Sequence, residues 1–232
     1  MRVGIAFDLR FTENSYSGSP SHILEGNLDP LLPEDAFEEM DSIETVEAIE
    51  SILHRAGHET LRLGSGKGFV VSVLENPVDI VFNIAEGWGT RSREAHVPSV
   101  LEMLGIPYTG SDPLTLALTL DKRVVMSAGV LTPRFMILKS LEDFNSDLSF
   151  PLILKPAWEG SSIGIRRNSK VENIKEFVEK FEWLIDSYRE PCLVEEFIQG
   201  EEVTVGVMGN ESPRVIGMMM IQPRNGSFRD FI

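Results

Sequence analysis

Cysteine is nearly absent from this sequence: Cys192 is the only one, so no disulfide can form within the chain. It lies in an apolar stretch, where we expect a buried thiol without a reactive role. The sequence also lacks any apolar run close to the ~18 residues of a membrane-spanning helix. Its first residues, MRVGIAFD, show no signal-peptide pattern. These absences favour a cytoplasmic location over a secreted or membrane-embedded one.

Positive charge is scarce as well. The chain carries 21 Lys and Arg against 36 Asp and Glu, which gives a formal net charge of −15. Such a surface repels phosphate backbones and anionic lipid headgroups, which argues against nucleic acid and membranes as partners. A small anion held in a local basic pocket stays compatible with this charge.

Three common site motifs are missing. His54 and His58 are four residues apart, but Gly57 between them indicates a helix end, so the histidines give no metal-binding pattern. The sequence contains no G-x-x-x-x-G-K-[ST] phosphate loop, and no G-x-G-x-x-G follows the first predicted strand. A nucleotide site in this protein would therefore need a different phosphate-binding element.

What is present is the composition of a globular protein, with 42% hydrophobic and 25% charged residues among 232. In the first half, stretches of strand length alternate with stretches of helical period. We predict strands over 3–7, 59–63 and 78–84, and helices over 43–56, 68–76 and 95–104. Ser42 is the predicted N-cap of the first helix, and Gly57 ends it. This alternation predicts an α/β fold with a parallel sheet covered by helices.

The segment AEGWGTRSRE, at 85–94, follows the third predicted strand. Parallel sheets bind their ligands at the carboxyl ends of the strands, and Gly87 and Gly89 allow a ligand to approach closely. Arg91 and Arg93 are candidates for holding a carboxylate there. The alternative is a turn with two surface arginines, and the position of the segment favours the binding role.

The second half of the chain is richer in strands. We predict strands over 134–138, 152–154, 192–198, 203–208 and 214–221, and helices over 114–120 and 171–188. The last of these helices is amphipathic. Its predicted inner face is Ile174, Phe177, Val178, Phe181 and Ile185, and its predicted solvated face is Lys175, Glu179, Lys180 and Glu182.

The most informative stretch is PLILKPAWEGSSIG, at 151–164. Lys155 ends a short apolar strand, and the small polar residues Gly160, Ser161 and Ser162 form a loop that Gly164 closes. A loop of this kind can point backbone N–H groups at an anion, and the lysine adds a positive charge. We interpret it as a flap over nucleotide phosphates, with Ile165 continuing its far strand. A Gly/Ser hairpin turn beside a solvent-exposed lysine is the alternative.

Further polar residues are candidates for completing a nucleotide site. Lys122 precedes the flap in sequence, while Glu195 on a predicted strand and Glu202 after a turn follow it. Two lysines and a glycine-containing flap suit a polyphosphate, whereas the carboxylates suit an adenine amino group and ribose hydroxyls.

Four segments resemble one family in their order along the chain: YTGSDPLTLALTLDK, PLILKPAWEGSSIG, LVEEFIQGEEVTV and IQPRNGSF. They are similar to the D-alanine–D-alanine ligase group of ATP-grasp enzymes. The resemblance runs from about Val78 to the end. It implies a Rossmann-like pre-ATP-grasp domain at 1–110, a central α+β ATP-grasp subdomain with the flap at 111–199, and the start of a C-terminal ATP-grasp subdomain at 200–232.

The resemblance also implies an activity. Enzymes of this group use ATP to convert a carboxylate into an acyl phosphate, which an amine then attacks to form an amide. It implies small-molecule substrates such as D-alanine, a role in peptidoglycan synthesis, ATP and Mg²⁺ as cofactors, and it is compatible with a homodimer. The implied ATP-binding residues are Lys122, Lys155, Glu159, Ser161, Ser162, Glu195 and Glu202, and the implied catalytic residues are Ser161, Glu13 and Arg91.

The sequence departs from the family in two substrate loops and at its end. FDLRFTEN replaces the glycine-rich loop after the first strand, with Glu13 as the nearest replacement for its glutamate, and NIAEGWGTRSRE replaces a histidine-glycine motif. The family's Mg²⁺ ligands are expected in a C-terminal part that this sequence lacks. Two alternatives therefore stay open: a related ligase with another substrate pair, or a nucleotide-binding fragment without catalysis.

Overall fold

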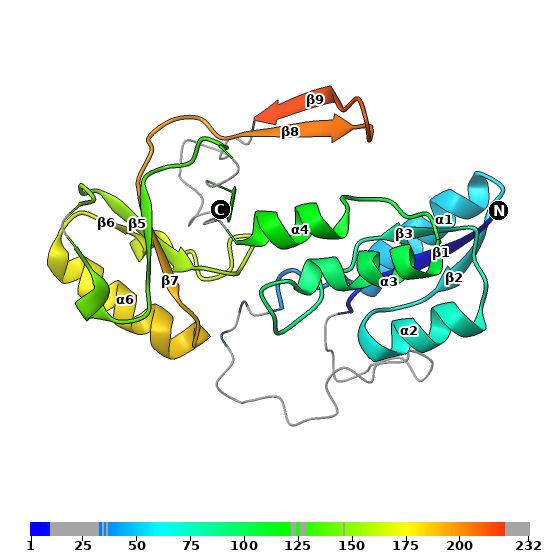
Figure 1. Cartoon of the computed structure of the whole chain (residues 1–232), viewed down its shortest axis with the longest axis horizontal. Coiled ribbons are helices and arrows are strands. Elements are labelled where there is room, and N and C mark those ends of the chain that lie inside the picture. The colour runs from blue at the N-terminus through cyan, green and yellow to red at the C-terminus, as the bar shows by residue number, and fades with distance from the viewer. Residues whose placement is uncertain are drawn as a thin grey trace. The chain divides into compact units, whose positions relative to one another are not determined.

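The computed structural model describes residues 1–9, 33, 35, 37–121, 124–125, 129–145 and 147–220. The described residues of Met1–Leu131 and of Ala157–Ile163 form one compact unit, called unit 1. Those of Thr132–Pro156 and from Gly164 onward form unit 2. Figure 1 labels the helices and strands of both units. The flap loop thus groups with unit 1, although the strand that precedes it belongs to unit 2.

Unit 1 contains a parallel sheet with the strand order β2-β1-β3. Its strands are β1 (Arg2–Ala6), β2 (Glu59–Arg62) and β3 (Ile80–Asn83). In the central strand, Val3 pairs with Thr60 on one side and with Ile80 on the other. Tyr108 adds a parallel bridge to Val81 of β3. The parallel sheet predicted from the alternation of strands and helices is confirmed.

Helices cover both faces of this sheet (Figure 1). The covering helices are α1 (Ile43–Arg55), α2 (Gly66–Glu75) and α3 (His96–Leu104), whereas the short 3-10 helix η1 (Arg93–Ala95) and α4 (Pro113–Leu120) pack beside α3. Ile5 packs with Val46 of α1, whereas its neighbour Ala6 packs with Phe69 of α2 and Leu101 of α3. Because successive side chains of a strand point to opposite faces, this alternation places α1 on one face and α2 and α3 on the other.

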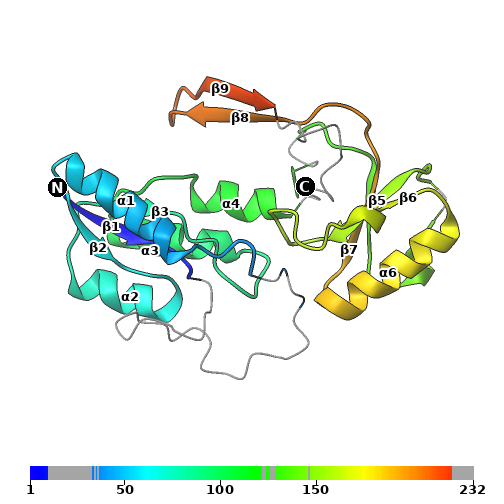
Figure 2. The same cartoon turned by 180° about the vertical axis from the view of Figure 1, so that it is seen from behind.

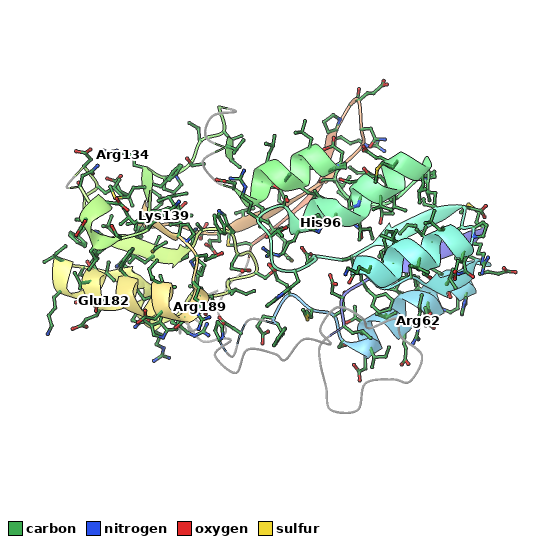
Figure 3. The ribbon with its side chains drawn as sticks, turned by 60° about the horizontal axis from the view of Figure 1, so that its bottom comes forward. Arg62, His96, Arg134, Lys139, Glu182 and Arg189 are labelled. Atoms are coloured by element: carbon green, nitrogen blue, oxygen red, sulfur yellow. The ribbon has the colours of Figure 1, made fainter. Side chains whose placement is uncertain are left out.

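Local signals in the sequence set the ends of α1. The Ser42 hydroxyl accepts the Thr45 N–H at 3.2 Å, which is the predicted N-cap. Gly57 follows the helix with φ +83°, a conformation that favours glycine. Arg62 of β2 then donates to both carboxylate oxygens of Glu50 on α1, and Figure 3 labels this arginine. These contacts hold the helix against the sheet edge.

Unit 2 contains an antiparallel sheet with the strand order β4-β7-β5-β6. The strands are β4 (Phe135–Leu138), β5 (Leu152–Pro156), β6 (Lys170–Val171) and β7 (Cys192–Glu196). The remaining elements are the 3-10 helices η2 (Leu141–Asp143) and η3 (Arg167–Ser169) and the helix α6 (Ile174–Tyr188). Figure 2 shows α6 lying along this sheet. Leu152, Leu154 and Val194 of the sheet pack with Phe177 and Phe181 of α6 in one core.

The solvated face predicted for α6 is partly wrong. Lys180 is only 2% exposed, whereas Ile174, predicted to face inward, is 53% exposed. Lys180 lies three residues after Phe177 and four before Leu184, both of which are buried, so it shares their stripe of the helix. The lysine was assigned to solvent by residue type, and the helical period overrides that assignment.

The predicted far strand of the flap is also wrong. Residues 165 and 166 are irregular, and η3 follows before the chain pairs with β5 as β6, through Val171 opposite Leu152. The last strands, β8 (Val203–Met208) and β9 (Arg214–Met220), form a separate antiparallel pair with an irregularity at Gly206. No helix within the described part of the chain is both long and apolar enough to cross a membrane.

Candidate functional site

Asp8 organises the carboxyl edge of the parallel sheet in unit 1. It follows β1, it is 7% exposed, and its carboxylate accepts the Ser65 hydroxyl and the Gly87 N–H, the latter at 2.8 Å. Ser65 follows β2 and Gly87 follows β3, so one carboxylate joins the ends of all three strands. Gly87 has φ +74°, and a Cβ there would lie 2.7 Å from the Arg93 carbonyl oxygen, so this close turn requires glycine.

A second carboxyl group lies beside Asp8. The Asp41 N–H donates to the Asp8 carbonyl at 2.6 Å, and the Asp8 N–H donates to the Asp41 carboxylate at 3.4 Å. Burial raises the pKa of Asp41 to about 6. The hydrogen bond from the Asp8 N–H lowers this pKa, and the negative charge of Asp8 raises it further. The pair fixes the start of α1 to the same sheet edge.

Arg93 is the buried cation of this edge. Its side chain is 5% exposed, and its guanidinium donates to the Glu39 carboxylate at 2.7 Å, the Glu159 carboxylate at 3.1 Å and the Trp158 carbonyl at 2.6 Å. Burial disfavours the charged form, but Glu159 and then Glu39 outweigh it and hold the pKa of Arg93 above its ordinary value. Arg93 is therefore held by three acceptors of the protein itself. The sequence placed it correctly after β3, but it binds carboxylates of the protein itself.

Glu86 is the carboxyl group of this edge whose pKa lies near neutrality. Burial, with the charges of Glu94 and Glu39, raises the pKa of Glu86 to about 7. Burial also raises the pKa of Glu159. A carboxyl group that titrates near neutral pH can exchange a proton under physiological conditions, which is a property of acid–base sites. No pattern in the sequence indicates this raised pKa, apart from the position of Glu86 after β3.

Arg91 behaves differently from Arg93. Its side chain is 61% exposed, and it pairs with the buried Asp121 at 3.4 Å, at the end of α4. An arginine with this exposure has donors left for a second anion, because a guanidinium carries several N–H groups in a planar fork. Of the two arginines in this segment, Arg91 is the one that fits a substrate carboxylate.

The flap loop has the backbone of an anion-binding turn. Ser161 has φ 44° and Ser162 has φ 64°, two successive left-handed residues that are not glycine. The Ile163 N–H closes the turn onto the Gly160 carbonyl at 2.9 Å. Turns of this type direct neighbouring backbone N–H groups to one side, where they bind anions. A Cβ on Gly160 would lie 2.5 Å from a carboxylate oxygen of Glu39, so glycine allows the flap to lie close to Glu39.

The far end of the flap is fixed within unit 2. Gly164 has φ +77°, and its carbonyl accepts from the Lys180 ammonium at 3.3 Å and from the Ser169 hydroxyl at 3.5 Å. Lys180 also lies over the Trp183 ring, with its ammonium 3.8 Å from the ring centre. The buried lysine that the sequence analysis placed in solvent thus has a structural role at the flap.

Lys155 and Glu195 form an ion pair on the sheet of unit 2. The Lys155 ammonium lies 2.5 Å from the Glu195 carboxylate, and the two side chains are 21% and 6% exposed. Ile153 is paired with Glu195 in the β5–β7 register, so Lys155, two residues on, is its diagonal neighbour on the same face. The sequence selected both residues but gave no sign that they contact each other.

Three further residues were predicted for the site: Glu13, Lys122 and Glu202. Glu202 is exposed just before β8. Glu13, Lys122 and the segment at 221–228 lie outside the described residues. Within the described ranges, no three His, Cys, Asp or Glu side chains are grouped as a metal site.

Comparisons with known proteins show what this chain is similar to. A family model described as "D-ala D-ala ligase C-terminus" matches residues 124–231. The D-alanine–D-alanine ligase of Aquifex aeolicus is 33% identical over 195 residues, which cover 81% of this chain and 63% of the ligase. The chain is similar in sequence to D-alanine–D-alanine ligases. It spans 54–63% of the length of the first three curated relatives that it matches.

Solved ligase structures share the fold of this chain. A Bacillus anthracis D-alanine–D-alanine ligase complexed with ATP superposes with a TM-score of 0.65 at 21% identity, covering 97% of this chain and 67% of that one. The VanG D-Ala:D-Ser ligase of Enterococcus faecalis gives 0.64 at 20% identity, covering 97% and 71%. The predicted α/β fold of the ATP-grasp type is confirmed.

Proposed function

We propose that this protein is an ATP-dependent carboxylate–amine ligase of the D-alanine–D-alanine ligase type. One substrate carboxylate attacks the γ-phosphate of ATP to give an acyl phosphate and ADP. An amine then displaces phosphate and forms an amide. The observation that carries the proposal is the flap: Ser161 and Ser162, in successive left-handed conformations, follow the strand that holds Lys155. Homology to ligases across most of the chain supports the same reaction.

The nucleotide would bind the residues that the sequence assigns to it, taken one by one. Lys155, with Lys122, is assigned to the phosphates, and the flap N–H groups at Ser161 and Ser162 to the γ-phosphate. Glu195 is assigned to the adenine amino group and Glu202 to the ribose. Glu195 already binds Lys155, but a carboxylate has roughly four lone-pair sites, so it can also accept an N–H of adenine. Positioning and charge neutralisation by such groups supply most of the catalysis in phosphoryl transfer.

The amino-acid substrates would lie at the carboxyl edge of unit 1. Arg91 is assigned to a substrate carboxylate, Glu13 to an amino group, and Glu159 to the mouth of the flap. D-alanine is the first substrate to test. A different amine is the second candidate, for two reasons. The segment that contains Glu86 and Arg93 forms a buried cluster of charges. In addition, one of the solved ligases that share this fold is a D-Ala:D-Ser ligase.

We propose Mg²⁺ as the second cofactor, with its ligands outside the described residues, because these contain no group of three His, Cys, Asp or Glu side chains that could hold a metal ion. We therefore derive no step through the metal. We further propose domains at 1–110, 111–199 and 200–232, and a cytoplasmic protein that acts on small molecules rather than on nucleic acid or membranes. The net charge of −15 supports the last point. Light scattering tests whether the protein is a homodimer.

The first experiment measures phosphate release from Mg·ATP with and without D-alanine, together with ATP affinity by calorimetry. D-alanine-dependent release supports the ligase. ATP binding without release directs the search to other acceptors, and it also fits a nucleotide-binding fragment without catalysis. Absence of ATP binding contradicts the proposal.

Lys155→Met then tests the phosphate assignment. Loss of a charge-assisted contact predicts about 10- to 100-fold weaker ATP binding, or roughly 1.5–3 kcal/mol. Because Lys155→Met leaves the buried Glu195 without its cation, the double variant Lys155→Met/Glu195→Gln separates phosphate binding from this side effect. Lys175→Met, on an 84% exposed side chain of α6, is the control and should bind ATP as the wild type does. Equal ATP affinity in all four proteins contradicts the assignment.

A further inference from the structure

Arg93 makes contacts with two segments that are distant from it in sequence. One is Glu39, before α1. The other is the beginning of the flap, where Arg93 binds the Trp158 carbonyl and the Glu159 carboxylate. All four residues belong to unit 1. The contacts at 2.6–3.1 Å are within the normal hydrogen-bond range, and the arginine is 5% exposed.

These contacts act on the backbone of the flap as well as on a side chain. The Trp158 carbonyl is a backbone acceptor two residues before Gly160, so a bond to it restrains the path of the loop directly. The Glu159 carboxylate restrains the next residue, and Glu39, held by the same guanidinium, lies against Gly160. A single planar cation therefore fixes three consecutive residues just before Ser161.

The electrostatics require a cation at this point. Glu39 and Glu159 are mostly buried, with side chains 10% and 25% exposed, and the charges of Glu94 and Glu86 lie in the same surroundings. Without Arg93 the carboxylates would repel one another in a poorly hydrated site. Arginine suits the position because its rigid fork reaches several acceptors at fixed angles, which the single ammonium of a lysine cannot do.

We propose that Arg93 is a positioning residue for the phosphate flap: through the Trp158 carbonyl and Glu159 it holds residues 157–163 in one placement, so that the N–H groups at Ser161 and Ser162 are preorganised. Arg93 touches no substrate in this role. The placement of the flap is a property of the protein without ligand. Only its consequence for phosphate binding rests on the proposed function.

Hydrogen exchange measured by mass spectrometry tests the placement without any ligand. Arg93→Lys keeps the charge and loses the fork, so the amides of 158–163 should exchange at least ~10-fold faster than in the wild type. Glu159→Gln, which removes one charge and keeps an acceptor, should give a smaller increase and serves if Arg93→Lys does not fold. Arg62→Lys is the matched control, because Arg62 also makes a forked pair in unit 1, with Glu50. It should leave flap exchange unchanged. Flap exchange within twofold of the wild type in both Arg93→Lys and Glu159→Gln overturns the proposal.

Kinetics then separate positioning from general stability. Arg93→Lys should raise the KM for ATP about 10-fold while the KM for the acceptor amine and the melting temperature stay near those of Arg62→Lys. A parallel loss in both KM values contradicts a specific effect on the flap. If ATP does not bind to the wild type, the proposed function fails, whereas the exchange result without ligand still decides the role of Arg93.

Discussion

Gly164, at the far end of the flap, allows a quantitative test of how the flap is anchored. Its φ is +77°, and a Cβ placed there would lie 2.4 Å from Cγ and Cδ of Pro156 and 3.4 Å from the Tyr188 ring. Gly164→Ala therefore meets two separate costs. One is the left-handed backbone, which a residue with a Cβ adopts unwillingly. The other is overlap with a proline that cannot easily move.

The size of each cost follows from the geometry. A left-handed conformation costs a non-glycine residue about 1–2 kcal/mol. The contact at 2.4 Å is well short of ordinary van der Waals contact, and Pro156 is buried in β5 opposite Cys192, so relief requires a shift of the strand. Overpacking of this kind costs about 1–3 kcal/mol. We expect Gly164→Ala to lower the free energy of unfolding of unit 2 by about 2–5 kcal/mol.

Gly57→Ala is the matched control. Gly57 has φ +83°, nearly the same as Gly164, but a Cβ there meets nothing within 4 Å. Gly57→Ala should lower the free energy of unfolding only by the cost of the left-handed backbone, about 1–2 kcal/mol. Urea denaturation followed by circular dichroism measures both variants, and hydrogen exchange in β5 and β7 assigns the loss to unit 2. Equal destabilisation by the two substitutions would refute the argument from the Pro156 contact.

Two further predictions concern titrating groups. Glu86 has its ordinary pKa of 4.5 in the unfolded chain and a pKa of about 7 in the folded protein. Between these two pH values the folded state keeps a proton that the unfolded state has lost, so the contribution of Glu86 to stability falls as pH rises. Glu86→Gln should match the stability of the wild type near pH 5 and be more stable at pH 8, by about 1 kcal/mol after allowance for solvent screening. Thermal unfolding of both proteins across this pH range measures the difference in stability. A difference that does not change with pH would contradict the raised pKa of Glu86. Burial raises the pKa of Cys192 to about 12, so at pH 8 the folded protein should react with a disulfide reagent about 10³-fold more slowly than in urea. Equal rates in the two states would show that the thiol is not buried.

Much of the fold follows from local patterns in the sequence. The helix α1 was predicted within two residues because a capping serine, an apolar repeat of helical period and a final glycine all indicate the same element. The strand β8 was predicted at its observed bounds because its apolar run ends at a glycine-containing turn. The parallel pairing of β1, β2 and β3 follows from the alternation of strands and helices, whereas their order in the sheet was not predicted.

The candidate site was predictable only in part, because its contacts join residues that are distant in sequence. Lys155 and Glu195 were selected separately, and only the pairing of β5 with β7 brings them together. Glu39 lies in an acidic segment with no local signal, and its contact with Arg93 depends on the tertiary fold. Lys180 was assigned to solvent by residue type, whereas α6 buries it beneath the Gly164 carbonyl. Charged side chains are poor markers of exposure when they serve as anchors.

The ion pairs of the site have a consequence for how a nucleotide would bind. Arg93 is held by Glu39 and Glu159, and Lys155 is held by Glu195, so a polyphosphate that enters this acidic protein has to compete with a carboxylate for its cation. The competition costs least when the same ligand also satisfies Glu195, because a buried carboxylate without a donor is expensive. ATP does this if its phosphates bind Lys155 while its adenine amino group donates to Glu195. On this argument Lys155 binds the phosphate end of ATP and Glu195 the adenine end. The loss of ATP affinity in Lys155→Met/Glu195→Gln should then differ strongly from the sum of the losses in the two single variants. Additive losses would mean that the two residues bind the nucleotide independently and that the pair has no part in its recognition.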